Sequence, residues 1–148
     1  MTASPSLLRR FAAIIYDILL LFGVQIIASA LVVLPLGAAP RSAMGAGAFR
    51  LYLFGVTFIF FCWFWTHGGQ TLGMRAWRLR VVSRKSGASL DWRQATVRFA
   101  TAILSWLCLG LGFFWMLVDR ERFTWHDRLS ESKLILLPKH APGPKAVD

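Results

Sequence analysis

Three long apolar runs constrain this chain more than any other feature of its sequence. They cover residues 11–34, 49–66 and 99–118, and a helix rising about 1.5 Å per residue over such lengths spans most or all of a hydrocarbon layer about 30 Å thick. Hydrophobic residues make up 56% of the chain and charged residues 16%, against about 45–50% and about 25% in a soluble domain. The sequence therefore predicts an all-α integral membrane protein, and it argues against a soluble enzyme, a disordered chain and a disulfide scaffold.

The first run has two interpretations, a membrane span and a cleaved signal peptide. Ala28-Ser29-Ala30 has the small-x-small form of a cleavage site. The apolar run nevertheless continues through Leu34, and the carboxylate of Asp17 would lie inside the apolar region of the signal peptide. We therefore favour an uncleaved span.

The third run contains no charge but carries Gly110 and Gly112. A continuous helix from Ser89, a predicted N-cap, to Val118 would be about 45 Å long, which is more than the membrane alone requires. Either the start of this helix lies along the membrane interface, or the helix breaks at the two glycines. A broken run would form a hairpin or a re-entrant pair of half-helices.

The positions of the basic residues predict which ends lie together. Two Lys or Arg precede the first run, one lies between the first and second runs and another at the start of the second, six lie between the second and third with Arg98 as a seventh at the entry to the third, and six follow the third. The positive-inside rule then places the N-terminus, the second loop and the C-terminal tail of a multi-pass protein in the cytoplasm. Three simple crossings would leave the tail outside, so we prefer the hairpin to a violation of the rule.

The excess of basic residues also predicts a partner. With 17 Lys and Arg against 7 Asp and Glu, the chain carries a formal charge of +10. Because this charge flanks the apolar runs, we expect it to contact anionic lipid headgroups, and we expect no nucleic-acid partner. The candidates for contact with lipid or an acidic partner protein lie in the second loop: Arg75, Arg78, Arg80, Arg84 and Lys85.

Two short segments outside the runs favour β-structure. Residues 79–82 alternate in polarity, and residues 133–137 form an apolar piece too short to span a membrane. If they pair in a short cytoplasmic sheet, the C-terminus must be internal. We thus expect one membrane domain over residues 1–137, followed by a disordered tail over residues 138–148.

Asp17 is the strongest candidate for a functional residue. An ionisable side chain inside a membrane span is costly unless it is paired or hydrated, so it marks a functional site by default. Arg10 precedes it by seven residues, almost two helical turns, and lies on nearly the same face. Gln25, further along this side, either extends a polar path or forms a hydrogen bond between helices.

Motifs of catalysis are not found in the sequence. It contains no Gly-x-Ser-x-Gly, no His-Glu-x-x-His and no Cys-x-x-Cys, and its three histidines lack metal-ligand spacing. The loop at residues 69–73 lacks the Gly-Lys-Ser/Thr ending of a phosphate loop. We therefore expect no enzyme activity, no cofactor and no metal.

Several motifs in order resemble the RDD family of bacterial membrane proteins. They are Arg10 at the start of the first run, Asp17 inside it, Gly-Gln-Thr-Leu-Gly at residues 69–73, and Asp127 within Thr-Trp-His-Asp-Arg. The resemblance covers about residues 8–137 and implies that Arg10, Asp17 and Asp127 are the arginine and two aspartates that name the family. It also implies a location in the bacterial inner membrane and a suggested transport role, including sodium/proton exchange.

Two functions are compatible with these residues. In an ion-exchange component, Asp17 would bind and release a proton or cation, with Asp127 pairing with Arg10 near the cytoplasmic mouth. So few spans make a thin wall, which implies a homo-oligomer or an unknown membrane partner. In a non-catalytic adaptor or accessory subunit, the three charges would instead form an internal network. The polar residues that would support either site are Gln25, Gln70, Thr71 and Arg128.

Overall fold

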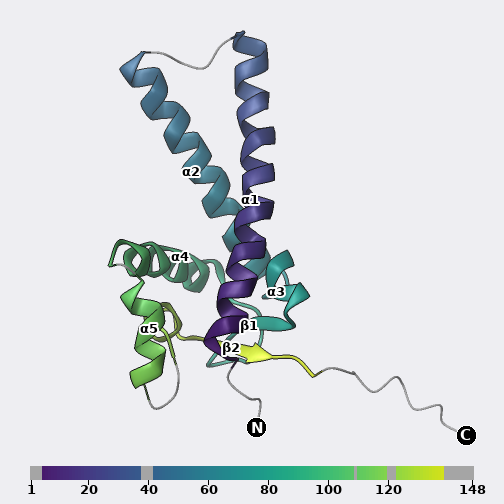
Figure 1. Cartoon of the computed structure of the whole chain (residues 1–148), viewed down its shortest axis with the longest axis vertical. Coiled ribbons are helices and arrows are strands. Elements are labelled where there is room, and N and C mark those ends of the chain that lie inside the picture. Colours follow the sequence, from purple (N-terminus) through teal and green to yellow (C-terminus); the bar gives the residue numbers. More distant parts are fainter. Residues whose placement is uncertain (1–4, 38–41, 109, 120–122, 139–148) are drawn as a thin grey trace, which may run out of the picture.

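Two long helices rise from a compact base in the computed structural model, which describes residues 5–37, 42–108, 110–119 and 123–138 (Figure 1). The base contains four shorter helices and a two-stranded sheet. The elements in chain order are α1 (Leu7–Leu36), α2 (Ala43–Thr66), α3 (Leu72–Ala76), β1 (Leu79–Ser83), α4 (Trp92–Leu107), α5 (Leu111–Val118), α6 (Trp125–Leu129) and β2 (Ser132–Leu136).

Helices α1 and α2 are long and apolar enough to cross a membrane, which confirms the first two predicted spans. They form a V whose arms diverge away from the base (Figure 1). Large apolar side chains such as Phe22, Leu31 and Leu51 are exposed along them, as lipid-facing helices require. Helix α1 ends at Gly37, whose φ of 68° is the left-handed conformation that glycine adopts without strain.

The third apolar run is broken where the glycines predict. Helices α4 and α5 meet at an angle of 95°, with Gly110 at a φ of 78°. The pair therefore has the form of a broken or re-entrant segment rather than an antiparallel hairpin, and α4 lies across the base of the V (Figure 1). The expectation of an N-cap at Ser89 is wrong, because Asp91 and Gln94 cap each other's backbone N–H groups and start the helix at Trp92.

The predicted β pairing is confirmed. Strands β1 and β2 are antiparallel, with Leu79 opposite Leu136 and Val81 opposite Leu134. Leu79 and Val81 are almost fully buried, so this face of the sheet belongs to the core. The pairing brings the described C-terminal residues to the end of the molecule where α1 begins (Figure 1).

The hydrophobic core sits at the base, between the lower parts of α1 and α2, helix α4 and the sheet. Phe99 of α4 is its aromatic centre, in edge contact with Phe58 of α2 at a centroid distance of 5.3 Å. Residues 139–148, most of the predicted disordered tail, lie outside the described residues. The buried members of the core are Ala13, Cys62, Trp65, Met74, Leu79, Val81, Leu90, Ala95, Phe99 and Leu134.

Candidate functional site

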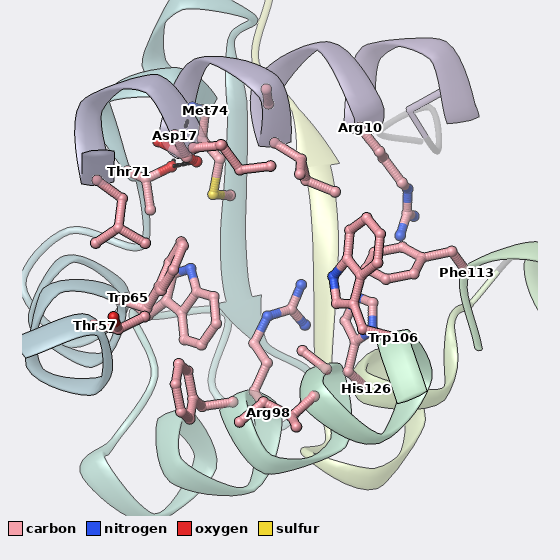
Figure 2. A pocket seen from close by; sticks show the side chains of 18 of the residues that line it. Arg10, Asp17, Thr57, Trp65, Thr71, Met74, Arg98, Trp106, Phe113 and His126 are labelled. Atoms are coloured by element: carbon pink, nitrogen blue, oxygen red, sulfur yellow. Dashed lines mark hydrogen bonds between the residues drawn. The ribbon is translucent and has the colours of Figure 1, made fainter. Parts of the chain in front are cut away.

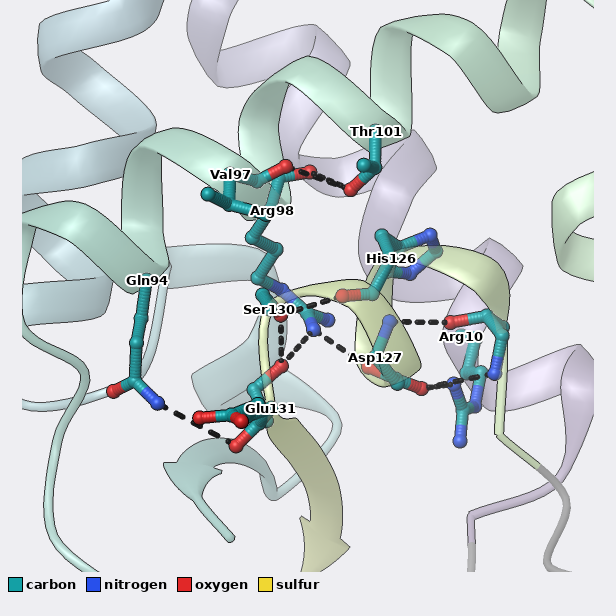
Figure 3. A network of polar contacts seen from close by, with 11 residues as sticks. Arg10, Gln94, Val97, Arg98, Thr101, His126, Asp127, Ser130 and Glu131 are labelled. Carbon is teal, nitrogen blue, oxygen red and sulfur yellow. Dashed lines mark hydrogen bonds and ion pairs between the residues drawn. The ribbon is translucent and has the colours of Figure 1, made fainter. Parts of the chain in front are cut away.

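Asp127 is the centre of a buried charge cluster. It is the third residue of α6, and it exchanges capping hydrogen bonds with Thr124, which starts this helix. Arg10 Nη1 donates to its Oδ2 at 2.8 Å, and Arg98 Nη1 donates to its Oδ1 at 2.6 Å (Figure 3). One carboxylate therefore joins α1, α4 and α6.

Arg98 extends this cluster in two directions. Its Nη1 also donates to Ser132 Oγ at 2.6 Å, at the start of β2. Its guanidinium carbon lies 5.3 Å from the centre of the Trp65 ring of α2, a cation–π distance. The Arg98 side chain thus contacts both the sheet and α2.

The cluster fixes the ionisation of two side chains on α6. Burial would raise the pKa of Asp127, but the guanidinium groups of Arg98 and Arg10 outweigh it and hold the pKa well below its usual range. Burial lowers the pKa of His126 to about 3, and the positive charge of Arg98 adds to this effect. At neutral pH the cluster therefore contains an ionised carboxylate beside a neutral imidazole, which packs edge-on against Phe113 at 4.8 Å.

Asp17 lies in a different set of contacts. Its carboxylate accepts a hydrogen bond from Thr71 Oγ1 at 2.5 Å and another from the backbone N–H of Gly73 at 2.8 Å. A Cβ atom on Gly73 would come within 2.3 Å of the carbonyl oxygen of Ala13, so only glycine permits this approach of α3 to α1. Gly73 therefore allows α3 to pack closely on α1, and the hydrogen bonds to Asp17 hold it there.

The remaining polar candidates connect neighbouring elements. Gln25 Nε2 donates to the Leu53 carbonyl at 2.9 Å and to Thr57 Oγ1 at 2.7 Å. Gln25 therefore joins α1 to α2 by hydrogen bonds. Gln70 Nε2 donates to the Leu79 carbonyl at 2.6 Å. Arg128 forms an ion pair with Asp119 at 2.5 Å, and half of the Arg128 side chain is exposed.

The five basic residues of the second loop are not equivalent. Arg75, Arg84 and Lys85 are exposed, whereas Arg78, which precedes β1, and Arg80, which lies in it, are half-buried. The guanidinium of Arg84 lies 4.7 Å from the ring centre of Phe123, and Lys85 pairs with Glu131 at 2.6 Å.

A cavity of about 330 Å³ lies between α1, α2 and α4, beneath the V. Asp17 and Thr71 lie on one side of it, and Arg98 and His126 lie on the opposite side (Figure 2). Its other walls are mostly apolar side chains from the three helices. Within the described ranges, no three or more His, Cys, Asp or Glu side chains are grouped to hold a metal ion.

The model of the RDD family matches residues 4–131. The chain belongs to the RDD family. No curated protein and no solved structure matches it. In this RDD protein, the three residues that the resemblance singles out lie in two groups: Arg10 with Asp127, and Asp17 with Thr71 and Gly73.

Sequence reasoning missed three residues that belong to the charge cluster or line the cavity: Arg98, Trp65 and His126. Arg98 had a usable signal, because it directly precedes a run of 20 uncharged residues, as Arg10 directly precedes the first run. Trp65 and His126 had none, since an indole near a membrane interface and an isolated histidine are common without any special role.

Proposed function

We propose that this RDD protein is a non-catalytic adaptor or accessory subunit of the bacterial inner membrane. One observation supports this function above ion exchange: each carboxylate oxygen of Asp17 and Asp127 accepts a hydrogen bond from another part of the chain. Carboxylates held in this way join elements together, and releasing them to carry a proton or cation would loosen the base of the fold. In this proposal, the charges of Arg10, Asp17 and Asp127 have a structural role.

In this proposal the N-terminus and the sheet face the cytoplasm. The basic residues near the start of α1 and around β1 then meet the anionic inner leaflet, as the positive-inside rule favours. The surface offered to a partner consists of exposed apolar side chains of the bent pair α4–α5 together with exposed basic residues of the second loop. These residues are Leu104, Leu107, Leu111, Leu117, Val118, Arg75, Arg84 and Lys85.

The experiment is a measurement of assembly size in native membranes solubilised with a neutral detergent. We expect the wild type to run as a complex larger than one chain, either a homo-oligomer or a complex with another membrane protein. The combined change Arg75→Gln, Arg84→Gln and Lys85→Gln should dissociate it without lowering the melting temperature. Arg50→Gln is the matched control, because it removes an exposed charge in the N-terminal part of α2, away from the base, and it should leave the complex intact. A chain that is monomeric at every concentration would refute the proposal.

Sodium/proton exchange is the second candidate, and it is supported by the position of Asp17 on the wall of the cavity. With two long helices and a broken third segment, a conducting pathway would need a homo-oligomer or a partner. The test is pH-driven sodium flux into proteoliposomes. Exchange predicts flux in the wild type that Asp17→Asn abolishes, whereas Asp91→Asn, at an exposed helix cap outside the cavity, retains it. Equal flux in both variants would exclude Asp17 as the carrier.

A further inference from the structure

The cavity beneath the V combines apolar walls with buried polar hydrogens. Its volume of about 330 Å³ lies at the small end of ligand pockets, which run from about 300 to 1,000 Å³. Pockets of this kind bind a largely apolar ligand and orient it by a few polar groups. Among the side chains that make the apolar walls are Ile14, Ile18, Phe54, Phe61, Phe99 and Ile103.

Arg98 presents an unused edge within this cavity. Both of its hydrogen bonds, to Asp127 and Ser132, leave from Nη1. Its Nε is buried and has no hydrogen-bond partner among the described residues. In a guanidinium, Nε and Nη2 form a planar fork whose two N–H groups match the two oxygens of a carboxylate or phosphate. Arg98 is only 5% exposed, so water outside the protein does not satisfy this edge.

Trp65 of α2 supplies another donor from the wall next to Arg98. Its indole Nε1 is buried and lacks a hydrogen-bond partner in the described part of the chain, and the residue is 8% exposed. Figure 2 shows the side chains of Trp65 and Arg98 projecting into the same cavity from α2 and α4. A buried donor without an acceptor is destabilising, and buried donors that meet in one cavity indicate an acceptor that is bound there.

We infer that this cavity binds one alkyl chain ending in a carboxylate or phosphate group, taken from the surrounding membrane lipid. The anionic group lies on the Nε and Nη2 fork of Arg98 and on Nε1 of Trp65, and the alkyl chain lies among the apolar walls between α1, α2 and α4. This site is separate from the headgroup contacts of the exposed basic loop, and it goes beyond the proposed accessory role, since a membrane subunit needs no internal lipid.

Three probes distinguish the sources of such a ligand, with the full chain held in a neutral detergent. Dodecanoate has both the chain and the charge, dodecanol has the chain alone, and inorganic phosphate has the charge alone. We expect one dodecanoate per chain, bound at least about tenfold more tightly than dodecanol, because the alcohol cannot fill a charged two-oxygen site. Phosphate should neither bind nor compete. Equal affinity for dodecanol, or competition by phosphate at the concentration that binds dodecanoate, would overturn the inference.

Two variants on one helix locate the site. Ala102 lines the cavity, whereas Ala100 is exposed on the same helix. Ala102→Phe should therefore reduce dodecanoate binding at least about tenfold by filling the space, and Ala100→Phe should leave it unchanged. Trp65→Phe keeps an aromatic ring but removes Nε1–H, and it should weaken dodecanoate several-fold and dodecanol less, because only the carboxylate accepts a charge-assisted hydrogen bond there. These three results together support the site, and unchanged binding in both Trp65→Phe and Ala102→Phe would contradict it.

Discussion

Arg98 and Asp127 are 29 positions apart in the chain, and Nη1 of Arg98 donates to Oδ1 of Asp127 at 2.6 Å inside the protein. The other oxygen of the same carboxylate accepts from Arg10, so guanidinium groups that directly precede the first and third apolar runs share one acceptor. A carboxylate buried between two cations is costly to remove, because each cation then lacks a counter-charge in a medium that solvates it poorly.

Asp127→Asn should therefore destabilise the protein by about 3–5 kcal/mol, the cost typical of breaking a buried ion pair on one side. Thermal unfolding in a neutral detergent, followed by circular dichroism, measures the effect. Glu131→Gln is the control, because the Glu131 and Lys85 side chains are 53% and 74% exposed and such a pair contributes less than about 1 kcal/mol. Similar melting temperatures for the two variants would show that the cluster does not stabilise the fold.

Gly73→Ala should loosen the contact between α3 and α1. The added methyl would lie 2.3 Å from the carbonyl oxygen of Ala13 and 2.8 Å from Asp17 Oδ1. Residues 71–73 must then move away from α1 and lose their hydrogen bonds to Asp17. We expect a lower melting temperature and faster proteolysis of the loop. Gly47→Ala in α2 is the matched control, since no atom lies within 4 Å of its added methyl. Equal proteolysis rates would rule out close packing at Gly73.

The stability of the protein should fall as pH falls below about 6.5, the ordinary pKa of histidine. Burial lowers the pKa of His126 to about 3 in the folded protein, so between these values the unfolded chain binds a proton that the folded chain does not. Asp127 adds to the loss only below its ordinary pKa of about 4. Melting temperatures from pH 7 to pH 4.5 test this, and His126→Gln should flatten the profile whereas His67→Gln, at an exposed position, should not.

Because β1 and β2 pair, residues next to these strands should be accessible to a labelling reagent from the same side of the membrane. In a background where Cys62 and Cys108 are replaced by serine, single cysteines at Lys85 and Pro138 should react with a membrane-impermeant thiol reagent from one side. A cysteine at Met44, near the start of α2, should react from the other. Labelling of Pro138 from the side of Met44 would be incompatible with pairing of β1 and β2 in the membrane-bound protein.

The sequence predicts the fold well where the signal is local. The lengths of the first two apolar runs predict α1 and α2, and the glycine at position 110 predicts the break in the third run, because hydrophobicity and backbone freedom are properties of single segments. The start of α4 was misplaced by two residues, since Ser89 and Asp91 are both good caps and only the reciprocal bond to Gln94 decides between them.

The site was less predictable because its contacts are non-local. Arg10 and Asp17 lie on nearly the same helical face, yet they bind different elements, and the choice depends on where α3 and α6 pack. No property of Arg98 in isolation reveals that it reaches both Asp127 and Ser132. The cavity is a property of three packed helices, so no single segment of the sequence encodes it.

The 117 positions between Arg10 and Asp127 have a consequence for biosynthesis. Arg10 leaves the ribosome long before the carboxylate that neutralises it, so α1 is made while Arg10 still lacks this counter-charge. Arg10 becomes half of a buried ion pair only once nearly the whole chain has been made. A chain interrupted before α6 therefore lacks the shared acceptor of Arg10 and Arg98, and its base stays unclosed.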